Sequence, residues 1–446
     1  MRKTVLILVA VVIVAAIAGA VLVRLLSPGP LAFAGGTPVP LADYQAADPT
    51  GVPAELKDAD AVKRGEYLTR AADCMVCHTS PGGTPYAGGL AIPLPFGTLY
   101  STNITPDKAT GIGDYSDADF LNAVQHGVRR DGARLYPAMP YPSYTYMTDA
   151  DALAIKAYLF SLPPVHAANR ADTLSFPFNQ RWAMGPWSLF FNENVRFQPN
   201  AARSPEWNRG AYLAEALAHC GDCHTPRNLA FALDNRSKFA GAVAAGWHAF
   251  NITSDRGTGI GAWSDNEITD YLTTGHASGR GTAAGPMGEA VDQSFSLLTP
   301  ADVKSVVAYL RSIPPIASSE PATIAPPAPA SPRQGGETAD TMGKRIFAGA
   351  CAGCHGWTGV SAISPYATIA GARAVNDPDA INVAQIVISG TKRHRPPGVI
   401  SMPAFGDAYS DTEIASLVNF VTKRFGSAPS RISAKEVAEL RGQTSY

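Results

Sequence analysis

The stretch Cys74-Met75-Val76-Cys77-His78 places two cysteines around two other residues, with a histidine directly after the second cysteine. The same C-x-x-C-H pattern returns at Cys220-Gly221-Asp222-Cys223-His224 and again at Cys351-Ala352-Gly353-Cys354-His355. The chain has six cysteines, and the three copies use all of them. One such match could arise by chance, but three matches that use every cysteine predict one shared chemical role.

C-x-x-C-H is the attachment signature of c-type haem. Two thiols at this spacing can each bond one vinyl group of the same porphyrin, and the adjacent histidine then lies under the iron as its proximal ligand. We therefore predict three covalently bound haem c groups. Their covalent attachment residues are Cys74, Cys77, Cys220, Cys223, Cys351 and Cys354, and their proximal iron ligands are His78, His224 and His355.

Three other uses of paired cysteines fit this sequence poorly. A structural zinc site needs four ligands, whereas each motif offers two thiols and one imidazole. A thioredoxin-like redox pair lies beside a βαβ pattern, and no such pattern surrounds these motifs. Disulfides serve small secreted domains, but a chain of 446 residues can bury a sizeable core without them.

The length and the charge balance of the chain limit its class further. A chain of 446 residues suggests about three domains of roughly 150 residues each, which agrees with one haem per domain. Lys and Arg number 36 against 37 Asp and Glu, a net charge of −1, so we expect no nucleic acid partner. The charged fraction is 16% and the apolar fraction 46%, which suits a subunit of a larger or membrane-associated assembly.

The N-terminal segment predicts an apolar helix. Arg2 and Lys3 precede an uncharged run from Thr4 to Val23, long enough for a helix of about 30 Å that could cross the hydrocarbon core. A cleavable signal normally has a shorter apolar stretch of about 7–15 residues, although small-residue cleavage sites follow at Ala18 and Ala34. We predict a retained membrane anchor, with a cleaved signal as the alternative. Both place the rest of the chain in the periplasm, because basic residues stay on the cytoplasmic side.

The first two motifs lie in an internal repeat. Before them, Arg64-Gly65-Glu66-Tyr67-Leu68 matches Arg209-Gly210-Ala211-Tyr212-Leu213, and after them Asn103-Ile104-Thr105 matches Asn251-Ile252-Thr253. A third, more divergent copy opens at Gly343 and closes with the segment from Ile414 to Phe425. Each copy, called a unit below, reads as an opening helix, a haem motif, a long loop region and a closing helix. The sequence therefore predicts a mainly α fold with three tandem units.

The helix limits can be read from local signals. Ser204-Pro205-Glu206 offers a cap residue followed by proline in the first turn, which is typical of a helix start. The closing helices are expected to begin after Thr148 and Thr299 and to end before proline pairs, since proline cannot continue a helix. Their predicted buried stripes are Leu153, Ala157 and Leu159 in the first unit and Val303, Val306, Val307 and Leu310 in the second.

Composition shifts set the boundaries. We place the anchor or signal segment at 1–26, the first unit at 45–165, an aromatic-rich connector at 166–203, the second unit at 204–316, a Pro/Ala-rich linker at 317–336, the third unit at 337–426 and a tail at 427–446. The linker predicts a semi-rigid, extended tether. We expect the connector aromatics to pack the first two units together; alternatively, they form an apolar surface for a partner subunit, a membrane or a quinone.

The sixth iron ligand decides the chemistry of each haem. Methionine in that position closes the iron, raises its potential and favours electron transfer. Met139, Met287 and Met402 each lie in a proline-containing loop shortly before the closing helix of their unit. Equivalent placement in three units is better evidence than any single methionine, so we predict these three as the axial ligands opposite the histidines.

Several other side chains compete for the same positions. Met147 competes in the first unit, but it lies at the start of the closing helix and has no counterpart in the second. His126 and His276 could instead give bis-histidine haems. Met75 lies inside a motif and cannot reach the far face of its haem, and His219 is expected to be packed or solvated.

Four stretches carry a resemblance to a known family. They are Gly88-Gly89-Leu90-Ala91-Ile92-Pro93, Ser101-Thr102-Asn103-Ile104-Thr105-Pro106-Asp107, Leu135-Tyr136-Pro137-Ala138-Met139-Pro140-Tyr141 and the second motif with Thr225-Pro226-Arg227-Asn228. From about residue 45 to 425 the chain resembles the tri-haem cytochrome c subunit of membrane-bound bacterial dehydrogenases, which serves alcohol, gluconate, sorbitol, fructose and aldehyde dehydrogenases.

The resemblance implies three domains of the class I cytochrome c fold at the periplasmic face of the bacterial inner membrane. It also implies a dehydrogenase catalytic subunit with FAD, PQQ or a molybdenum cofactor as electron donor, and ubiquinone or a terminal oxidase as acceptor. We find no catalytic dyad or phosphate-binding loop, so we predict no catalytic residues and an electron-relay subunit of a dehydrogenase complex. The alternatives are a self-standing, peroxidase-like haem enzyme with one open iron, and a structural or sensor module that binds haem.

Overall fold

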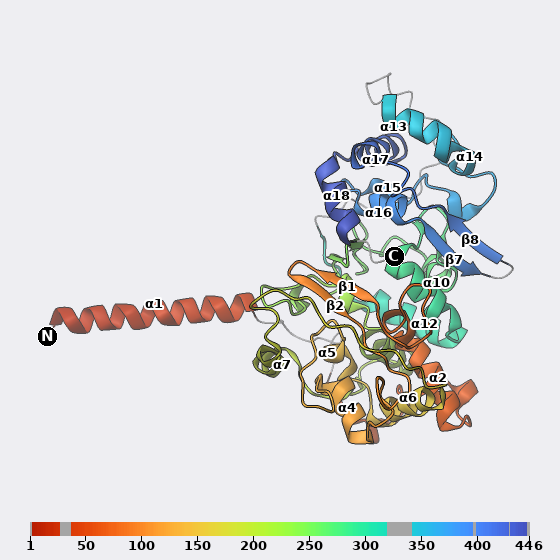
Figure 1. The fold of residues 1–446 in the computed structure, drawn as a ribbon. Coiled ribbons are helices and arrows are strands. Elements are labelled where there is room, and N and C mark those ends of the chain that lie inside the picture. The colour runs from red at the N-terminus through yellow and green to blue at the C-terminus, as the bar shows by residue number, and fades with distance from the viewer. Residues whose placement is uncertain (1, 27–36, 319–340, 396–397, 428, 444–446) are drawn as a thin grey trace.

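The computed structural model describes residues 2–26, 37–318, 341–395, 398–427 and 429–443. Within these ranges the chain is largely helical, as predicted, and its strands form short two-stranded sheets. Figure 1 shows the third unit lying beside the first two, and a long N-terminal helix that projects away from all three. The linker prediction falls mostly on residues 319–336, which lie outside the described ranges.

The elements of the first unit and its connector follow the predicted order. They are α2 (Ala61–Ala71), α3 (Cys74–Cys77), β1 (Ala91–Leu94), β2 (Gly97–Tyr100), α4 (Asp117–His126), α5 (Tyr141–Tyr144), α6 (Asp149–Ser161) and α7 (Met184–Phe191). The haem motif forms α3, directly after the opening helix α2, and the loop with Met139 leads through α5 into the closing helix α6.

The second unit repeats this order, and its methionine lies in a helix, α11, that is longer than α5 of the first unit. Its elements are α8 (Pro205–Tyr212), the π-helical turn η4 (Leu213–Leu217), α9 (Gly221–His224), β3 (Ala242–Ala244), β4 (Trp247–Ala249), α10 (Asp265–Thr274), β5 (His276–Ala277), β6 (Gly281–Thr282), α11 (Gly285–Gln293) and α12 (Pro300–Ser312).

The third unit ends in a helix that the sequence did not reveal. Its elements are α13 (Thr341–Ile346), the π-helical turn η7 (Phe347–Cys351), α14 (Ala352–His355), α15 (Arg373–Asn376), α16 (Ile381–Ser389), β7 (Thr391–Arg395), β8 (Gly398–Met402), α17 (Asp411–Phe425) and α18 (Ala434–Gln443). Helix α18 lies in the predicted tail and buries Val437 and Leu440 against α16 and α17. Short 3₁₀ turns complete the chain: η1 (Leu41–Asp43), η2 (Ala54–Leu56), η3 (Arg181–Ala183), η5 (Asn235–Ser237), η6 (Phe295–Leu297) and η8 (Pro365–Ala367).

The predicted helix limits agree with the structure. Ser204 caps α8 by accepting a hydrogen bond from the backbone N–H of Trp207, and Pro205 is the first helical residue. Thr148 and Thr299 cap α6 and α12 in the same way. The buried stripe was wrong in part: α12 buries its four predicted residues, but α6 buries Leu159 while Leu153 and Ala157 are only half-buried.

The opening and closing helices of each unit cross at a glycine. A Cβ added to Gly65 would lie 1.8 Å from the carbonyl oxygen of Ala154 on the closing helix. At Gly210 it would lie 1.8 Å from the carbonyl of Ser305, and at Gly343 it would lie 2.2 Å from that of Ser416. The backbones therefore touch where α2 packs on α6, α8 on α12 and α13 on α17. The three units therefore share the same close helix crossing.

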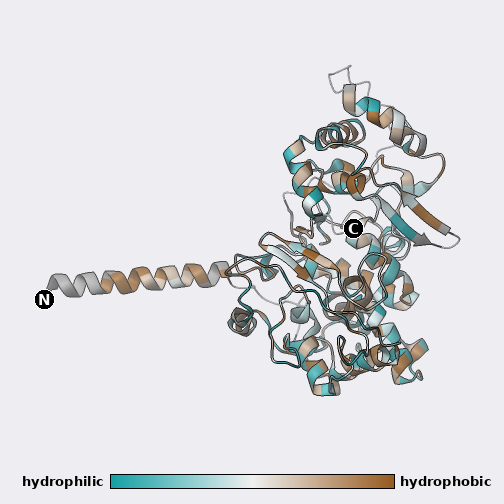
Figure 2. Cartoon of the chain, in the orientation of Figure 1, coloured by the Kyte–Doolittle hydropathy of each residue, from teal (hydrophilic) through white to brown (hydrophobic). Residues whose placement is uncertain are grey.

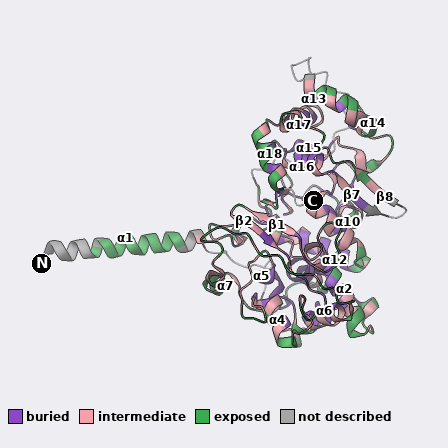
Figure 3. Cartoon of the chain, in the orientation of Figure 1, coloured by how far each residue is buried: buried purple, intermediate pink, exposed green. Residues whose placement is uncertain are grey.

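The first two units share one hydrophobic core. Leu68 and Ile155 of the first unit and Leu213 and Val306 of the second lie in the same cluster of buried side chains. The third unit has a separate core around Phe347, Ile414 and Val418. Figure 3 shows buried segments both in the first two units and in the third.

Two reciprocal hydrogen bonds join the first two units. The Tyr67 hydroxyl donates to Asp302, at the start of the second closing helix, over 2.7 Å. The Tyr212 hydroxyl donates to Asp151, at the start of the first closing helix. Each repeated Tyr thus binds the aspartate of the other unit, so the two units pack as a pseudo-symmetric pair.

The connector aromatics divide between the two expected roles. Phe197 is 1% exposed and packs in the shared core, as the packing prediction requires. Phe176 and Trp182 are 78% and 72% exposed, so this part of the connector presents apolar surface instead.

The N-terminal segment forms the helix α1 (Arg2–Leu26), which projects from the rest of the chain and is coloured as hydrophobic over part of its length (Figures 1 and 2). Its residues from Val11 to Leu22 are exposed. Among the residues that the structure describes, no helix is long and apolar enough to cross a membrane. The membrane-crossing part of the N-terminal prediction is therefore not supported.

We expect Gly210→Ala to lower the free energy of unfolding by about 3 kcal/mol or more, because the new methyl group meets a backbone oxygen that cannot move aside. Denaturant unfolding of the haem-loaded protein measures the change. Gly442→Ala is the control: this glycine lies on α18 with nothing within 4 Å of its added Cβ, so we expect it to be neutral or slightly stabilising. Equal losses in the two variants would contradict the close crossing.

Candidate haem sites

The first haem motif opens onto a cavity of about 620 Å³. Cys74, Cys77 and His78 line it together with Met139, which comes from the loop before the closing helix. The structure thus brings all four predicted site residues of the first unit to one cavity. Its volume lies within the range of about 300–1,000 Å³ that is typical of ligand sites.

The lining of this cavity fits a haem. Apolar side chains such as Ile112, Phe120 and Leu159 can cover the porphyrin faces, and Arg129 and Arg130 supply cations for its carboxylates. The donor set is two thiols, one imidazole and one thioether, which matches covalent haem c with His/Met ligation. Bound there, the haem would supply one-electron redox chemistry, while the chain holds it and shields it from water.

Each proximal histidine is oriented by a backbone carbonyl. The Nδ1–H of His78 donates to Thr102, that of His224 to Phe250 and that of His355 to Ala367, each over 2.6 Å. A carbonyl oxygen can only accept, so Nδ1 carries the proton and Nε2 keeps its lone pair for a metal. Burial also lowers the pKa of His78, which keeps this imidazole neutral, as iron ligation requires.

These carbonyls were missed from the sequence, although a signal was present. Thr102 and Phe250 directly precede the repeated Asn-Ile-Thr stretches. The Asn103 amide donates to the carbonyl of Val165 over 2.7 Å and to Thr110 over 3.0 Å, and Asn251 makes the equivalent bonds in the second unit. The repeat therefore records the loop that fixes the histidine carbonyl.

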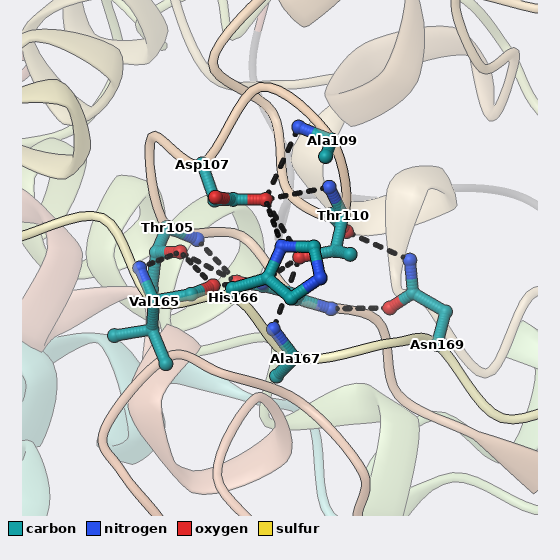
Figure 4. Close-up of polar contacts among 9 residues, drawn as sticks. Thr105, Asp107, Ala109, Thr110, Val165, His166, Ala167 and Asn169 are labelled. Carbon is teal, nitrogen blue, oxygen red and sulfur yellow. Dashed lines mark hydrogen bonds and ion pairs between the residues drawn. The ribbon is translucent and has the colours of Figure 1, made fainter.

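Figure 4 shows how this loop is closed in the first unit. Thr105 accepts from the backbone N–H of Val165 and Thr110 accepts from that of Ala167, so the segment after the closing helix is tied back onto the loop. Asp107 accepts from the backbone and side chain of Thr110, and these bonds lower its pKa. The carbonyl that orients His78 thus sits on a tightly bonded turn.

Met139 lies in a loop, as predicted, but Met287 lies in helix α11 and Met402 in strand β8, so the loop placement was wrong for these two. Thr102 to Met139 and Phe250 to Met287 span the same number of residues, so the first two units are in register from the histidine carbonyl to the methionine. Met287 lies in the first turn of α11 and packs against the shared core. Met402 ends β8 and packs against the core of the third unit.

The competing side chains are also placed. Met147 is buried and lines the first cavity together with Met139, so it stays a competing candidate for the sixth ligand of the first haem. His126 is not among the described residues that line this cavity. His276 is bonded to Thr282 and packs against Tyr366 of the third unit, and the largely buried His219 packs against Tyr144.

The first two sites are neighbours. Helix α3, which carries the first motif, packs on α11, which carries Met287. The Ser143 hydroxyl donates to Asp222 inside the second motif over 2.9 Å. Burial raises the pKa of the Cys77 thiol to about 12, and negative charge on Asp73 and Cys223 adds to the rise. The first two haem motifs are therefore close neighbours in the fold.

Family comparisons agree with this chemistry. Residues 62–163 match the model of the family described as cytochrome c, and residues 338–421 match that of cytochrome c oxidase, cbb3-type, subunit III. Fold and site together define a c-type cytochrome.

Relatives with similar sequences show which kind of c-type cytochrome this chain resembles. The gluconate 2-dehydrogenase cytochrome c subunit of Pantoea cypripedii is 40% identical over 85% of this chain and 89% of its own length. The fructose dehydrogenase cytochrome subunit of Gluconobacter japonicus is 38% identical over 85% and 82%. The cytochrome c subunit of the quinone-dependent alcohol dehydrogenase of Gluconobacter oxydans is 35% identical over 87% and 84%. The chain belongs to the family of dehydrogenase cytochrome c subunits.

We expect Met139→Ala to open the iron of the first haem, since the thioether would no longer occupy its sixth position. The expected result is one haem changed from low-spin to high-spin in the EPR spectrum. Met147→Ala is the matched control, because it removes the other methionine of the same cavity. If Met147→Ala opens the iron and Met139→Ala does not, the ligand assignment is wrong.

Proposed function

We propose that this protein is a tri-haem electron relay that carries electrons from a dehydrogenase catalytic subunit into the respiratory chain. The observation that carries the proposal is the threefold C-x-x-C-H motif in which each histidine donates to a backbone carbonyl. Three equivalent, metal-ready imidazoles beside paired thiols support three haem c groups with methionine as the sixth ligand.

The proposed donor is a catalytic subunit that carries FAD, PQQ or a molybdenum cofactor, and the proposed acceptor is ubiquinone or a terminal oxidase. Relatives named as subunits of gluconate and fructose dehydrogenases support a dehydrogenase donor. We place the protein at the periplasmic face of the bacterial inner membrane, where haem is ligated to exported thiols. Its own residues hold the haems in sequence and tune each potential through ligation, burial and hydrogen bonds.

The test combines haem counting with electron transfer. We expect a pyridine haemochrome assay to find three haems per chain and the absorption spectrum to show a methionine–sulfur charge-transfer band. Replacing both Cys351 and Cys354 by Ala should remove one haem. The intact protein should be reduced by a co-purified dehydrogenase when that enzyme receives its substrate.

The control is the cytochrome mixed with substrate but without the dehydrogenase, which should stay oxidised. Reduction by substrate alone, or a high-spin iron in the untreated protein, would favour a self-standing haem enzyme with an open iron. A haem count unchanged by the double cysteine replacement would overturn the assignment of the third motif.

A further inference from the structure

The third unit contacts the second unit at the helix that carries Met287 and at the loop whose carbonyl orients His224. Strand β7 packs on α11, which carries Met287 in its first turn. Helix α15 begins at Arg373, whose backbone N–H donates to the carbonyl of Arg280 over 2.9 Å. The Thr282 hydroxyl, in β6, donates to the carbonyl of Tyr366, the residue before the His355 acceptor.

Arg393 of the third unit binds residues of the second unit on both sides of Met287. Its Nε and Nη2 donate to the two carboxylate oxygens of Asp292 over 2.8 and 2.7 Å, and its Nη1 donates to the carbonyl of Ala283 over 2.9 Å. The two acceptors lie on either side of Met287 in the sequence. The side chains of Arg393 and Asp292 are only 4% and 8% exposed, so this bidentate pair is largely shielded from water.

Gly275 makes room for this contact. It ends α10 with φ +72°, and an added Cβ would lie 2.4 Å from Nη1 of Arg393. Its carbonyl also accepts from the backbone N–H of Ala283 over 2.7 Å. The guanidinium of Arg393 therefore packs against the turn at the end of α10, which is hydrogen-bonded to the segment just before Met287.

Arg373, also in the third unit, contacts the loop that orients His224, the predicted ligand opposite Met287. It is buried, its Nη1 donates to the carbonyl of Asn251 over 3.1 Å and its Nη2 donates to that of Thr258. Its guanidinium lies 4.5 Å from the centre of the Phe250 ring. Because the Phe250 carbonyl accepts from His224, Arg373 holds the loop that orients the proximal histidine.

The first unit closes the same loop in another way. There Asn169, a neutral residue of the connector, donates to the carbonyl of Thr110, the counterpart of Thr258, over 2.9 Å. Its side-chain oxygen accepts from the backbone N–H of Asn103. The loop that orients His78 is thus closed by a neutral residue of its own connector, whereas the corresponding loop of the second unit is bound by a cation from the third unit.

We propose that the third unit completes the second haem site, with Arg393 positioning Met287 and Arg373 positioning the loop that orients His224. The inference rests on the proposed His/Met ligation of the second haem. It adds that this ligation, and the potential that it sets, depend on residues of another unit. A cation beside a haem favours the reduced state, which has one positive charge fewer, so Arg373 raises the potential of the second haem.

The test of Arg393 compares three variants of the full-length holoprotein. Arg393→Gln should weaken the methionine–sulfur charge-transfer band by one haem's share, because Met287 loses its anchor. Met287→Ala should remove the same share and so reports on the ligation itself. Arg236→Gln is the control: Arg236 makes a bidentate pair with Asp234, as Arg393 does with Asp292, but neither residue of this pair lies next to a predicted methionine ligand in the sequence, so its loss should leave the band unchanged.

The outcomes separate the two hypotheses. If Met287→Ala leaves the band intact, the proposed ligation is wrong. If Met287→Ala weakens the band but Arg393→Gln does not, the ligation stands and the positioning role of Arg393 is refuted. Should Arg393→Gln yield no holoprotein, Arg393→Lys is measured instead. It keeps the charge but lacks the planar fork that binds both carboxylate oxygens of Asp292, so a band equal to that of the wild type would refute the role.

The test of Arg373 is a potentiometric titration. Arg373→Gln should lower the midpoint potential of one haem and leave the other two unchanged, while Arg373→Lys should restore most of the shift by restoring the charge. A purely structural role would not discriminate between these two variants. Unchanged potentials in Arg373→Gln would overturn the tuning role.

Discussion

The contact on which each unit depends is the crossing of two helices with no side chain between them. Gly65, Gly210 and Gly343 let the opening helix touch a carbonyl of the closing helix, and any larger residue would push the two apart. In each unit the haem motif follows the opening helix, and the segment with the predicted methionine ligand precedes the closing helix. The crossing therefore brings residues that are distant in sequence to one cavity, as the first unit shows with His78 and Met139.

The units are joined by two kinds of interface. The first two share an apolar core, and buried Tyr–Asp hydrogen bonds fix how they pack; Asp302 also binds Arg209 over 2.7 Å. Such a buried carboxylate is tolerated because donors satisfy it, and these directional bonds allow few other arrangements. The third unit keeps its own core and attaches through arginines that bind carbonyls and Asp292.

This arrangement puts the second site in the middle of the molecule. On one side its motif meets the first motif, through Asp222 and the neighbourhood of Cys77 and Cys223. On the other side its proximal loop lies under Arg373 of the third unit. In the proposed relay, control of the second site by a neighbouring unit would act on a site that contacts both of the other units.

Much of the fold and the site followed from the sequence, because their signals are local. The cysteine pairs and their histidines are adjacent residues, and the caps at Ser204, Thr148 and Thr299 act within one helical turn. The two-stranded sheets, helix α18 and the half-buried state of Leu153 were not predicted, since they depend on what packs against them. The carbonyls that orient the histidines lie 24, 26 and 12 residues away, and Arg393 lies 101 residues from Asp292. The sequence by itself thus determined the haem motifs and the class of protein, whereas only the tertiary structure decided how the motif histidines are oriented, because hydrogen-bond partners so far apart are selected by the path of the folded chain.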